Sequence, residues 1–485
     1  MSKSLIKKVL GNKIIVYLSS RYLIYLLQFI NSIIIAVNLG PYYLGVWGFS
    51  NLIIQYFNQI DFGVTQSFNA LGSIHKEDNE YVSELLGSTI IIEFVLCALA
   101  CMFLILIQNS SIGLGDKYNF SHYYLVVILS IILNYFVPTL LSLLRIYGDI
   151  QIISICQSLL PILNFLFMFF FKGEVLLLIM LWLVPVSLIL TVALCLIKLP
   201  IKIKFSWNFE LTKKLMKKGL HLFLYSSSFY FILYSTRSFV SMKYTVEEFG
   251  LFTFAFSLAN AIILLFKSFS FLVFPKLINR LSKSGKDALA LISGPRQEYM
   301  TMTHLVAHLA ILFFPLFIYF IPKYTGAVSM FSLTVLGLII YNNCYGFQEL
   351  LIAKGRDRKL GSIAFISLTV NVIAGLILVF YFFVPPHIAI FSIVISYFTF
   401  LFLLAIACRS ILEIPVDYKE IIMDAFPIRL LVPYLFSMYV SLSSYNNYFL
   451  YIIVLLIFLV LNRKELLNIK KTIVVILNNP NLVNV

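Results

Sequence analysis

Two arginines stand inside long apolar stretches of this chain, each within a stripe of polar residues at helical spacing. The first stripe is Arg21, Tyr25, Gln28 and Ser32. The second is Tyr230, Tyr234, Arg237 and Ser241. Steps of three and four residues place side chains on one face of a helix. Arginine binds pyrophosphate oxygens through paired donors, and tyrosine and amide groups can bond sugar hydroxyls. The pattern predicts a binding surface for a large, polar, anionic ligand.

Other polar and ionisable residues lie in neighbouring apolar stretches. Asn58 and Asp61 stand near the end of the second stretch, and Lys267 occupies the corresponding place 205 positions later, within one position of Asp61. We assign all three to the same ligand surface. Glu93 lies eight residues into the third stretch with no basic residue nearby in sequence. It is either a cavity residue or a carboxylate that couples transport to an ion, and Asp61 is a second candidate for ion coupling.

A second interpretation, in which these cations bind no ligand, also fits the sequence. Arg21, Arg237 and Lys267 each lie near a predicted helix end, from which a long side chain can extend its charge to the lipid headgroups. His304 and His308 have the spacing of two metal ligands, but the residues between them lack the glutamate of a zinc hydrolase helix. We interpret them as packing or interfacial histidines, and we expect neither a metal nor a cofactor.

The composition determines the class of protein that must position these residues. Of 485 residues, 61% are hydrophobic and 12% are charged, whereas soluble domains have roughly 45–50% and about 25%. The chain is therefore predicted to be an all-α polytopic membrane protein. Its net charge of +15 is explained by basic loops that face anionic lipid, so no nucleic-acid partner is expected.

Fourteen apolar stretches are long enough to be predicted as membrane-spanning helices, at about 20 residues per span. They are bounded by charged residues or by Pro and Gly. The predicted spans are 14–37, 44–64, 85–107, 123–144, 150–171, 175–197, 220–242, 249–273, 300–321, 326–350, 361–383, 387–407, 426–445 and 448–462.

The distribution of Lys and Arg predicts the orientation of these spans. With the N-terminus in the cytoplasm, most of the 36 basic residues fall in cytoplasmic segments, as the positive-inside rule requires. Both termini are then cytoplasmic. The exceptions are Lys117, Lys172, Lys243 and Lys323 outside, and Arg21, Arg237 and Lys267 within helices.

A lysine-rich segment, residues 198–218, divides the chain into an N-terminal six-helix lobe (1–197) and a C-terminal six-helix lobe (219–408). Two further helices and a cytoplasmic tail follow (409–485). The segment holds seven lysines and one acid, so it must stay cytoplasmic. It is either a topology signal alone or also a tether between two mobile lobes.

Short similarities relate the two lobes. The stretch Tyr43–Phe49 is matched 205 positions later by Glu248–Phe254, and Leu144–Asp149 is matched 207 positions later by Leu351–Arg356. A duplicated unit of six helices has an even number of spans, so its copies are parallel. Secondary transporters use such repeats to enclose a substrate path between halves that rock.

The glycine-containing stretch Leu39–Phe49, followed by Asp61-Phe62-Gly63, resembles the start of polysaccharide-biosynthesis membrane proteins. These are the Wzx-type flippases of O-antigen and related glycans, in the multidrug/oligosaccharidyl-lipid/polysaccharide exporter superfamily. Glu248–Phe252 and Phe274–Leu277 are also similar to that family. The resemblance implies two six-helix lobes. It further implies a multi-pass protein of the bacterial inner membrane that serves lipopolysaccharide or other polysaccharide biosynthesis by translocating an undecaprenyl-pyrophosphate-linked oligosaccharide. Membrane lipids, a glycan polymerase and a chain-length regulator are the other partners it suggests.

Three alternatives remain open. A cation-coupled multidrug exporter of the same superfamily would favour acidic and apolar cavity residues and twelve helices. An integral-membrane glycan polymerase or ligase would need a sizeable outer loop, but the longest predicted outer connection runs only from Gln108 to His122. A purely structural role leaves the aligned intramembrane charges unexplained. We therefore expect a transporter and not an enzyme.

Overall fold

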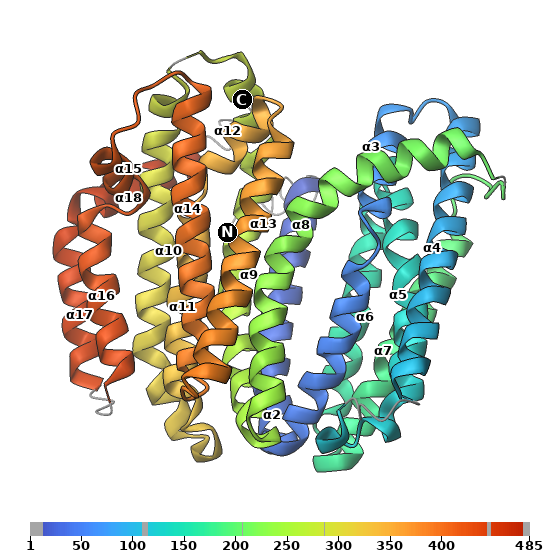
Figure 1. Ribbon diagram of the computed structural model, residues 1–485, viewed down its shortest axis with the longest axis horizontal. Helices are drawn as coiled ribbons and strands as arrows, with labels where there is room; N and C mark the ends of the chain where they lie inside the picture. Colours follow the sequence, from blue (N-terminus) through green and yellow to red (C-terminus); the bar gives the residue numbers. More distant parts are fainter. Residues whose placement is uncertain (1–12, 109–114, 206, 286, 444–447, 479–485) are drawn as a thin grey trace. The chain divides into compact units, whose positions relative to one another are not determined.

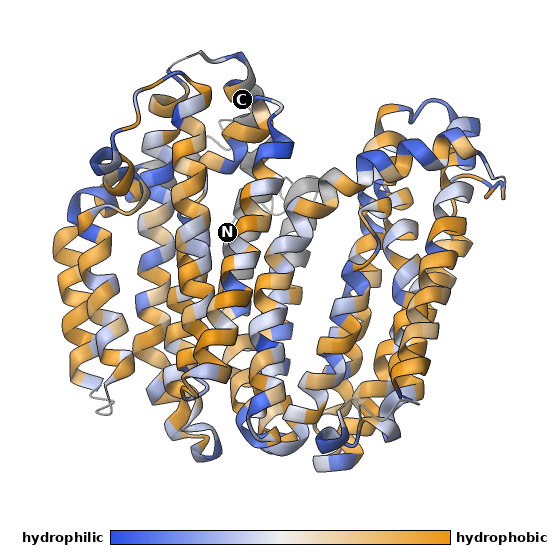
Figure 2. Ribbon diagram, in the orientation of Figure 1, coloured by the Kyte–Doolittle hydropathy of each residue, from blue (hydrophilic) through white to orange (hydrophobic). Residues whose placement is uncertain are grey.

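The computed structural model describes residues 13–108, 115–205, 207–285, 287–443 and 448–478. Within these ranges it describes all side chains except those of 13–21, 221–222, 263–279, 282 and 472–478. Every regular element in the described ranges is a helix (Figure 1). Hydrophobic residues run along these helices, and hydrophilic residues gather at helix ends and loops (Figure 2). The predicted all-α class is confirmed.

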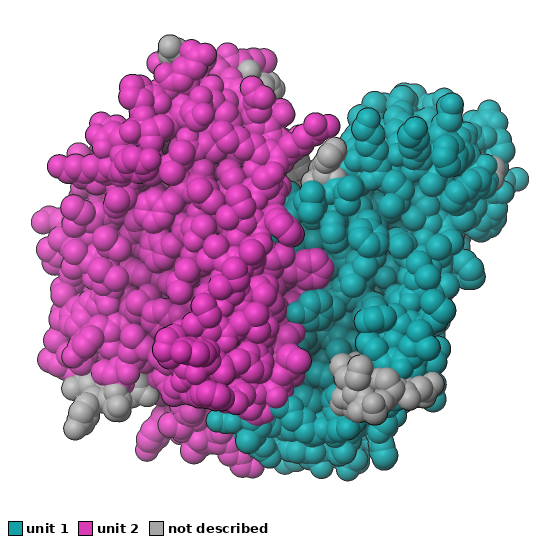
Figure 3. All heavy atoms as spheres, in the orientation of Figure 1, with its two compact units in different colours: residues 1–230, 245–250 teal, residues 231–244, 251–485 magenta. Residues whose placement is uncertain are grey.

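The chain divides into two compact units (Figure 3). Unit 1 comprises Met1–Tyr230 and Thr245–Gly250, and unit 2 comprises Phe231–Tyr244 and Leu251–Val485. The long helix α8 (Phe209–Lys243) contributes residues to both units.

Unit 1 is built around α5, which lies against five other helices of the unit: α2, α3, α4, α6 and α7. More than ten side chains of α5 are buried, as expected for a helix that is surrounded by others. The helix also contains Pro138. The helices are α2 (Lys13–Gln59), α3 (Val64–Ile74), α4 (Asn79–Gln108), α5 (Phe120–Tyr147), α6 (Ile150–Phe167) and α7 (Gly173–Ile197), with a short 3₁₀ turn, η1 (Asp116–Tyr118).

The first two predicted spans both belong to α2, which is broken between them. Gly40 has φ 73° and ψ 168°, and Pro41 follows it. A positive φ favours glycine, and proline has no N–H to continue the helical ladder. A second interruption follows Gln59, where Phe62 and Gly63 both have positive φ before α3 begins. The prediction missed this second break and extended the span to residue 64.

Unit 2 is built around α11, whose side chains are buried along almost its whole length and which lies against α10, α14 and α16. The helix α13 packs closely against α14, whereas no contact between α11 and α13 is among the principal helix contacts of the described residues. The helices are α9 (Val246–Lys283), α10 (Ala288–Tyr319), α11 (Ala327–Asn342), α12 (Phe347–Ala353), α13 (Asp357–Leu376), α14 (Phe391–Ile411), α15 (Tyr418–Ala425), α16 (Ile428–Leu442), α17 (Tyr448–Leu461) and α18 (Arg463–Asn478). Two short 3₁₀ helices, η2 (Pro322–Tyr324) and η4 (Ile388–Ile390), lie between them, and a π-helical turn, η3 (Ile377–Tyr381), continues α13.

The predicted span 326–350 is two helices, α11 and α12, separated by a buried turn. Gly346, in this turn, has φ 89° and donates its N–H to Glu349 Oε2 at 2.6 Å. Glu349 is 6% exposed. Its carboxylate therefore caps a helix inside the protein, where the unpaired N–H groups of a helix start need an acceptor.

Nine helices of the described chain are long and apolar enough to cross a membrane, or ten if the bent pair α15 and α16 forms one span. The broken helix α2 counts once in this number although we predicted two spans there, and α17 has only 14 residues. A polytopic membrane protein is therefore supported. The count of fourteen spans and the cytoplasmic termini stay predictions.

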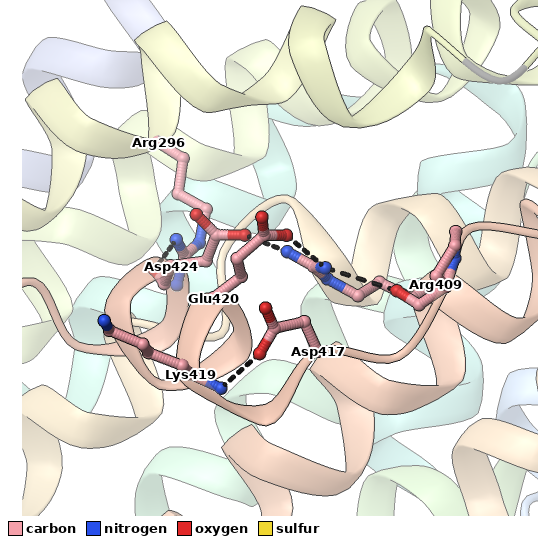
Figure 4. A network of polar contacts seen from close by, with 7 residues as sticks. Arg296, Arg409, Asp417, Lys419, Glu420 and Asp424 are labelled. Atoms are coloured by element: carbon pink, nitrogen blue, oxygen red, sulfur yellow. Dashed lines mark hydrogen bonds and ion pairs between the residues drawn. The ribbon is translucent and has the colours of Figure 1, made fainter.

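Two arginines, Arg409 and Arg429, hold the last helices of unit 2 together, and neither was among the predicted site residues. Arg409 is 7% exposed and donates to Glu420 and Asp424 of α15, both at 2.8 Å (Figure 4). Arg429 at the start of α16 contacts Gln297 and Thr301 of α10, and Asn462 and Glu465 near the start of α18; the Nη1–Thr301 bond is 2.9 Å and the Nε–Glu465 pair is 3.4 Å. These bonds fix the bend between α15 and α16, which is 66°.

The lysine-rich segment packs against unit 1. Leu211 and Leu215, at the start of α8, are buried in a hydrophobic cluster with residues of α3, α4 and α5. Ser83 donates its hydroxyl to the carbonyl of Lys202 at 2.5 Å, and Lys204 pairs with Glu84 at 2.8 Å. Leu211 and Leu215 thus face the unit, whereas most of the lysines of the segment are exposed, as are Phe205, Trp207 and Phe209.

Candidate functional site

The α2–α3 turn holds one of the two acids that we predicted for ion coupling. Asp61 Oδ1 accepts a hydrogen bond from the Gly63 N–H at 2.8 Å, and Oδ2 accepts one from the Thr65 N–H at 3.4 Å. The carboxylate therefore lies at the start of α3, where backbone donors are unpaired and negative charge is stabilised.

Glu93 lies at the centre of α4 and is 0% exposed. At about 1.5 Å per residue, it is roughly 21 Å from either end of this 30-residue helix. Its Oε1 accepts hydrogen bonds from the hydroxyl of Thr65 at 3.1 Å and from the hydroxyl of Thr139, which is a short bond. Its Oε2 is buried and has no hydrogen-bond partner among the described residues.

A hydrophobic cluster holds the three helices around this acid. Val64 and Phe68 of α3 are fully buried against Leu85 and Leu86 of α4 and Leu143 of α5. The cluster fixes α3 so that Thr65 bridges the two carboxyl groups, with its N–H on Asp61 and its hydroxyl on Glu93.

The other predicted site residues of unit 1 do not form a comparable group of hydrogen-bonded side chains in the described structure. Tyr25 and Gln28 are half-buried on α2. Asn58 is half-buried near the end of α2, and its Oδ1 has no hydrogen-bond partner within the described structure. The side chain of Arg21 lies outside the described residues, as does that of Lys267 in unit 2.

Tyr234 and Arg237 lie on the part of α8 that belongs to unit 2. Arg237 is 4% exposed, and its guanidinium lies over the ring of Phe256 at 5.2 Å from the centroid. A cation over an aromatic face is attracted by the ring quadrupole. Tyr234 is 8% exposed. The Arg237 side chain is thus buried and does not extend to the surface.

Among the predicted residues, the structure brings together Asp61 and Glu93. The two threonines that complete this group were missed. A threonine in a helix most often bonds the carbonyl of the preceding turn, so its presence in an apolar stretch carries no signal. Only the three-dimensional convergence of α3, α4 and α5 distinguishes Thr65 and Thr139 from other helical threonines.

The two histidines of α10 have hydrogen-bond partners in the interior of unit 2. His304 Nε2 lies 3.2 Å from Asn343 Oδ1, and His308 Nδ1 lies 3.0 Å from the hydroxyl of Ser437. The described residues contain no group of three His, Cys, Asp or Glu side chains that could hold a metal ion.

Searches against protein-family models and against curated proteins found no match. Solved structures do match. The lipid II flippase MurJ in an inward closed conformation has a TM-score of 0.69 at 14% identity, over 95% of this chain and 100% of MurJ. A multidrug resistance MATE family transporter of the MOP superfamily has a TM-score of 0.59 in its inward-facing conformation, at 15% identity, over 83% of this chain and 98% of the transporter. A MATE transporter in an outward-facing conformation matches with a TM-score of 0.51 at 15% identity, over 82% of this chain and 93% of the transporter. This chain therefore has the fold shared by the MurJ flippase and the MATE transporters.

Proposed function

We propose that this protein is a flippase that moves an undecaprenyl-pyrophosphate-linked oligosaccharide across the bacterial inner membrane by alternating access. The observation that carries the proposal is the extent of the structural similarity. MurJ covers 95% of this chain, whereas the MATE transporters cover 83% and 82%. A similarity of fold alone does not assign a substrate, so the composition of the oligosaccharide stays open. O-antigen units and other surface polysaccharide units are the candidates.

The buried polar residues support a polar, anionic cargo. Arg237 and Tyr234, which are buried in α8, provide a guanidinium and a phenol, and the half-buried Asn58 of α2 provides an amide. Such groups are costly within a bilayer and persist where they serve a substrate or ion path. Arg21, Tyr25, Gln28 and Lys267 complete the proposed ligand surface. A glycan polymerase and a chain-length regulator are the proposed partners that take over the translocated unit.

Deletion of the gene tests the function directly. Lipid-linked saccharides are extracted from the deletion strain, and the leaflet that holds them is determined with a reagent that reaches only the outer face. We expect single repeat units to accumulate on the cytoplasmic face and surface glycan to be lost, with both restored by the wild-type gene. Unpolymerised units on the outer face would instead identify a polymerase defect. Normal glycan with increased drug retention would identify a multidrug exporter.

Lipid II is a second candidate cargo because the lipid II flippase MurJ is among the solved structures that this chain resembles. Expression of this protein in cells depleted of their own lipid II flippase distinguishes the two cargoes. Rescue of growth would assign lipid II, whereas failure to rescue, together with the glycan phenotype above, would assign the surface oligosaccharide.

A further inference from the structure

We propose that Glu93 is the proton carrier of the transport cycle, with Asp61 as its neighbouring acid. This inference rests on the proposed transport function, because it names the ion whose movement drives that transport. It is carried by the geometry of the group Asp61, Thr65, Glu93 and Thr139 in unit 1.

The burial of Glu93 demands a bound cation. An isolated carboxylate in a protein interior costs several kcal/mol unless it is paired or neutralised. The titratable groups that interact electrostatically with Glu93 in the described structure are Asp61, Cys97 and Tyr135, all of them acids. Asp61 comes from the α2–α3 turn, Cys97 from α4 and Tyr135 from α5. The Cys97 thiol and the Tyr135 phenol are neutral near physiological pH, and the only charge that this group can add is the negative charge of Asp61. None of the three groups supplies a cation, so the neutralising cation is left to be bound from solution.

The arrangement of oxygens favours a proton over a metal ion. Oε1 already accepts the two threonine hydroxyls, and Oε2 is the single buried oxygen without a partner in the described part of the site. Hard metal ions bind through shells of several oxygens. A proton needs one oxygen, and Oε2 provides it.

The threonines allow the same carboxyl to exist in both protonation states. In the ionised state both hydroxyls can donate to Oε1, and hydrogen bonds to a charged group are the strong ones in a low-dielectric interior. A carrier must release its proton during each cycle, so an ionised form that is tolerated for part of the cycle is required. An acid that is surrounded only by apolar side chains would stay protonated throughout the transport cycle and could not release its proton.

The site is also connected to the helix that runs from unit 1 into unit 2. Gly63, in the turn that holds Asp61, packs directly against Gly219 of α8; a Cβ added to Gly219 would lie 2.8 Å from the Gly63 carbonyl oxygen. Gln66 of α3 donates to the hydroxyl of Ser226 of α8 at 2.9 Å. A change of charge at the two carboxyls therefore acts on the turn and, through it, on α8.

The first experiment observes the proton itself, without a substrate. The full-length protein in lipid nanodiscs is titrated with acid and base while infrared difference spectra are recorded. We expect the carbonyl band of a protonated carboxylic acid to disappear as pH rises, to be absent in Glu93→Gln and to persist in Glu174→Gln, which alters an exposed acid of the same unit. A wild-type spectrum without such a band at any pH at which the protein stays folded would overturn the proposal, as would a band that survives in Glu93→Gln.

The second experiment links the proton to transport. Proteoliposomes contain a pH-sensitive dye and the lipid-linked saccharides extracted from the deletion strain. We expect wild-type protein to move protons when saccharide moves, and Glu93→Gln to lose gradient-driven movement while it retains exchange of saccharide without a gradient. Gradient-driven movement that is unchanged in Glu93→Gln, or that follows a sodium gradient at constant pH, would overturn the proton role. If wild-type protein moves no saccharide although the infrared band titrates, the proposed flippase function fails while proton binding by Glu93 stands.

Discussion

Gly45 and Gly250 pack against each other's helices in a reciprocal contact. A Cβ added to Gly45 would overlap the carbonyl oxygen of Val246, and a Cβ added to Gly250 would overlap the carbonyl oxygen of Pro41. Pro41 and Val246 are separated by the same 205 positions as the two glycines. The contact therefore relates equivalent residues of the two predicted repeats, and only the absence of side chains lets these backbones approach so closely.

Gly45→Ala and Gly250→Ala are expected to lower the thermal unfolding midpoint in detergent. Alanine in place of a helical glycine gains about 1 kcal/mol of helix propensity, but overlap in a packed contact costs about 1–3 kcal/mol. Gly294→Ala in α10 is the matched control, because nothing lies within 4 Å of the added Cβ there. It should raise the midpoint. If all three variants shift the midpoint in the same direction, the close contact does not determine the stability of this crossing.

Much of this fold could be predicted from the sequence because an apolar stretch that is long enough to cross a bilayer forms a transmembrane helix in a membrane protein. The glycines that open the equivalent helices of the two lobes were also visible, since their spacing repeats. The breaks within two predicted spans, near Gly63 and at Gly346, were not visible in the sequence. The stretches that contain the turns near Gly63 and at Gly346 are apolar enough over their whole length to be predicted as single spans, although polar residues flank both turns. Hydropathy averaged over a span does not distinguish a turn from a continuous helix. The positive φ of a glycine is a property of the folded backbone.

Arg296→Lys is expected to destabilise the attachment of α15 and α16. Arg296 is 3% exposed; it donates to the carbonyls of Asn343 at 2.7 Å and Ala425 at 3.3 Å, and makes a short bond to the carbonyl of Asp424. A lysine ammonium lacks the planar fork that reaches three carbonyls, and each buried carbonyl left without a donor costs about 1–3 kcal/mol. Hydrogen exchange should therefore become faster in α15 and the start of α16.

The control for this substitution is Arg358→Lys, which changes an exposed arginine of α13. It should leave exchange in α15 and α16 unchanged. Equal exchange in Arg296→Lys and wild type would show that the other arginine contacts alone hold these helices. Burial of Arg296 could not be foreseen, because in the sequence it is one more basic residue beside a predicted span.

Leu215→Ala is expected to loosen the lysine-rich segment from unit 1. Leu215 is fully buried in the cluster with α3, α4 and α5, and truncation of a buried leucine costs about 2–5 kcal/mol. Trypsin should then cleave faster after Lys213, Lys214, Lys217 and Lys218. Proteolysis at the rate of the wild type would mean that the apolar face of this segment does not secure it.

Lys204→Gln is the matched substitution on the exposed side of the same segment. Glu84 and then Glu80 raise the pKa of Lys204, so the lysine is charged at neutral pH and, on the alkaline side, the ion pair is lost as pH rises through that raised value. Exposed ion pairs contribute little to stability. The substitution removes the tryptic site at residue 204 itself, so cleavage is compared after Lys213, Lys214, Lys217 and Lys218. We expect cleavage at these sites in Lys204→Gln to match that of the wild type at neutral pH, at low and at high salt.

The two acids of the candidate site could be predicted from the sequence, but their arrangement in space could not. Glu93 stood out because an acid without a basic neighbour is rare in an apolar stretch. Its relation to Asp61 depends on Thr65, whose N–H and hydroxyl contact one carboxyl each. That bridge exists because α3 starts at a break that hydropathy does not reveal, so the sequence could name two candidate acids without showing that they form one group.

Arg237 provides the test of the proposed ligand surface. Loss of one charge-assisted hydrogen bond to a pyrophosphate costs about 1.5–3 kcal/mol, which is roughly a ten- to hundredfold loss of apparent affinity. In the leaflet assay we therefore expect Arg237→Ala to accumulate cytoplasmic-face saccharide as the deletion does. Arg237→Lys should show an intermediate defect, since it keeps the charge but not the paired donors. Because Arg237 also lies over Phe256, thermal unfolding of each variant must be measured alongside. Arg358→Ala is the control, and wild-type transport by a folded Arg237→Ala would exclude a role for this arginine in binding the cargo.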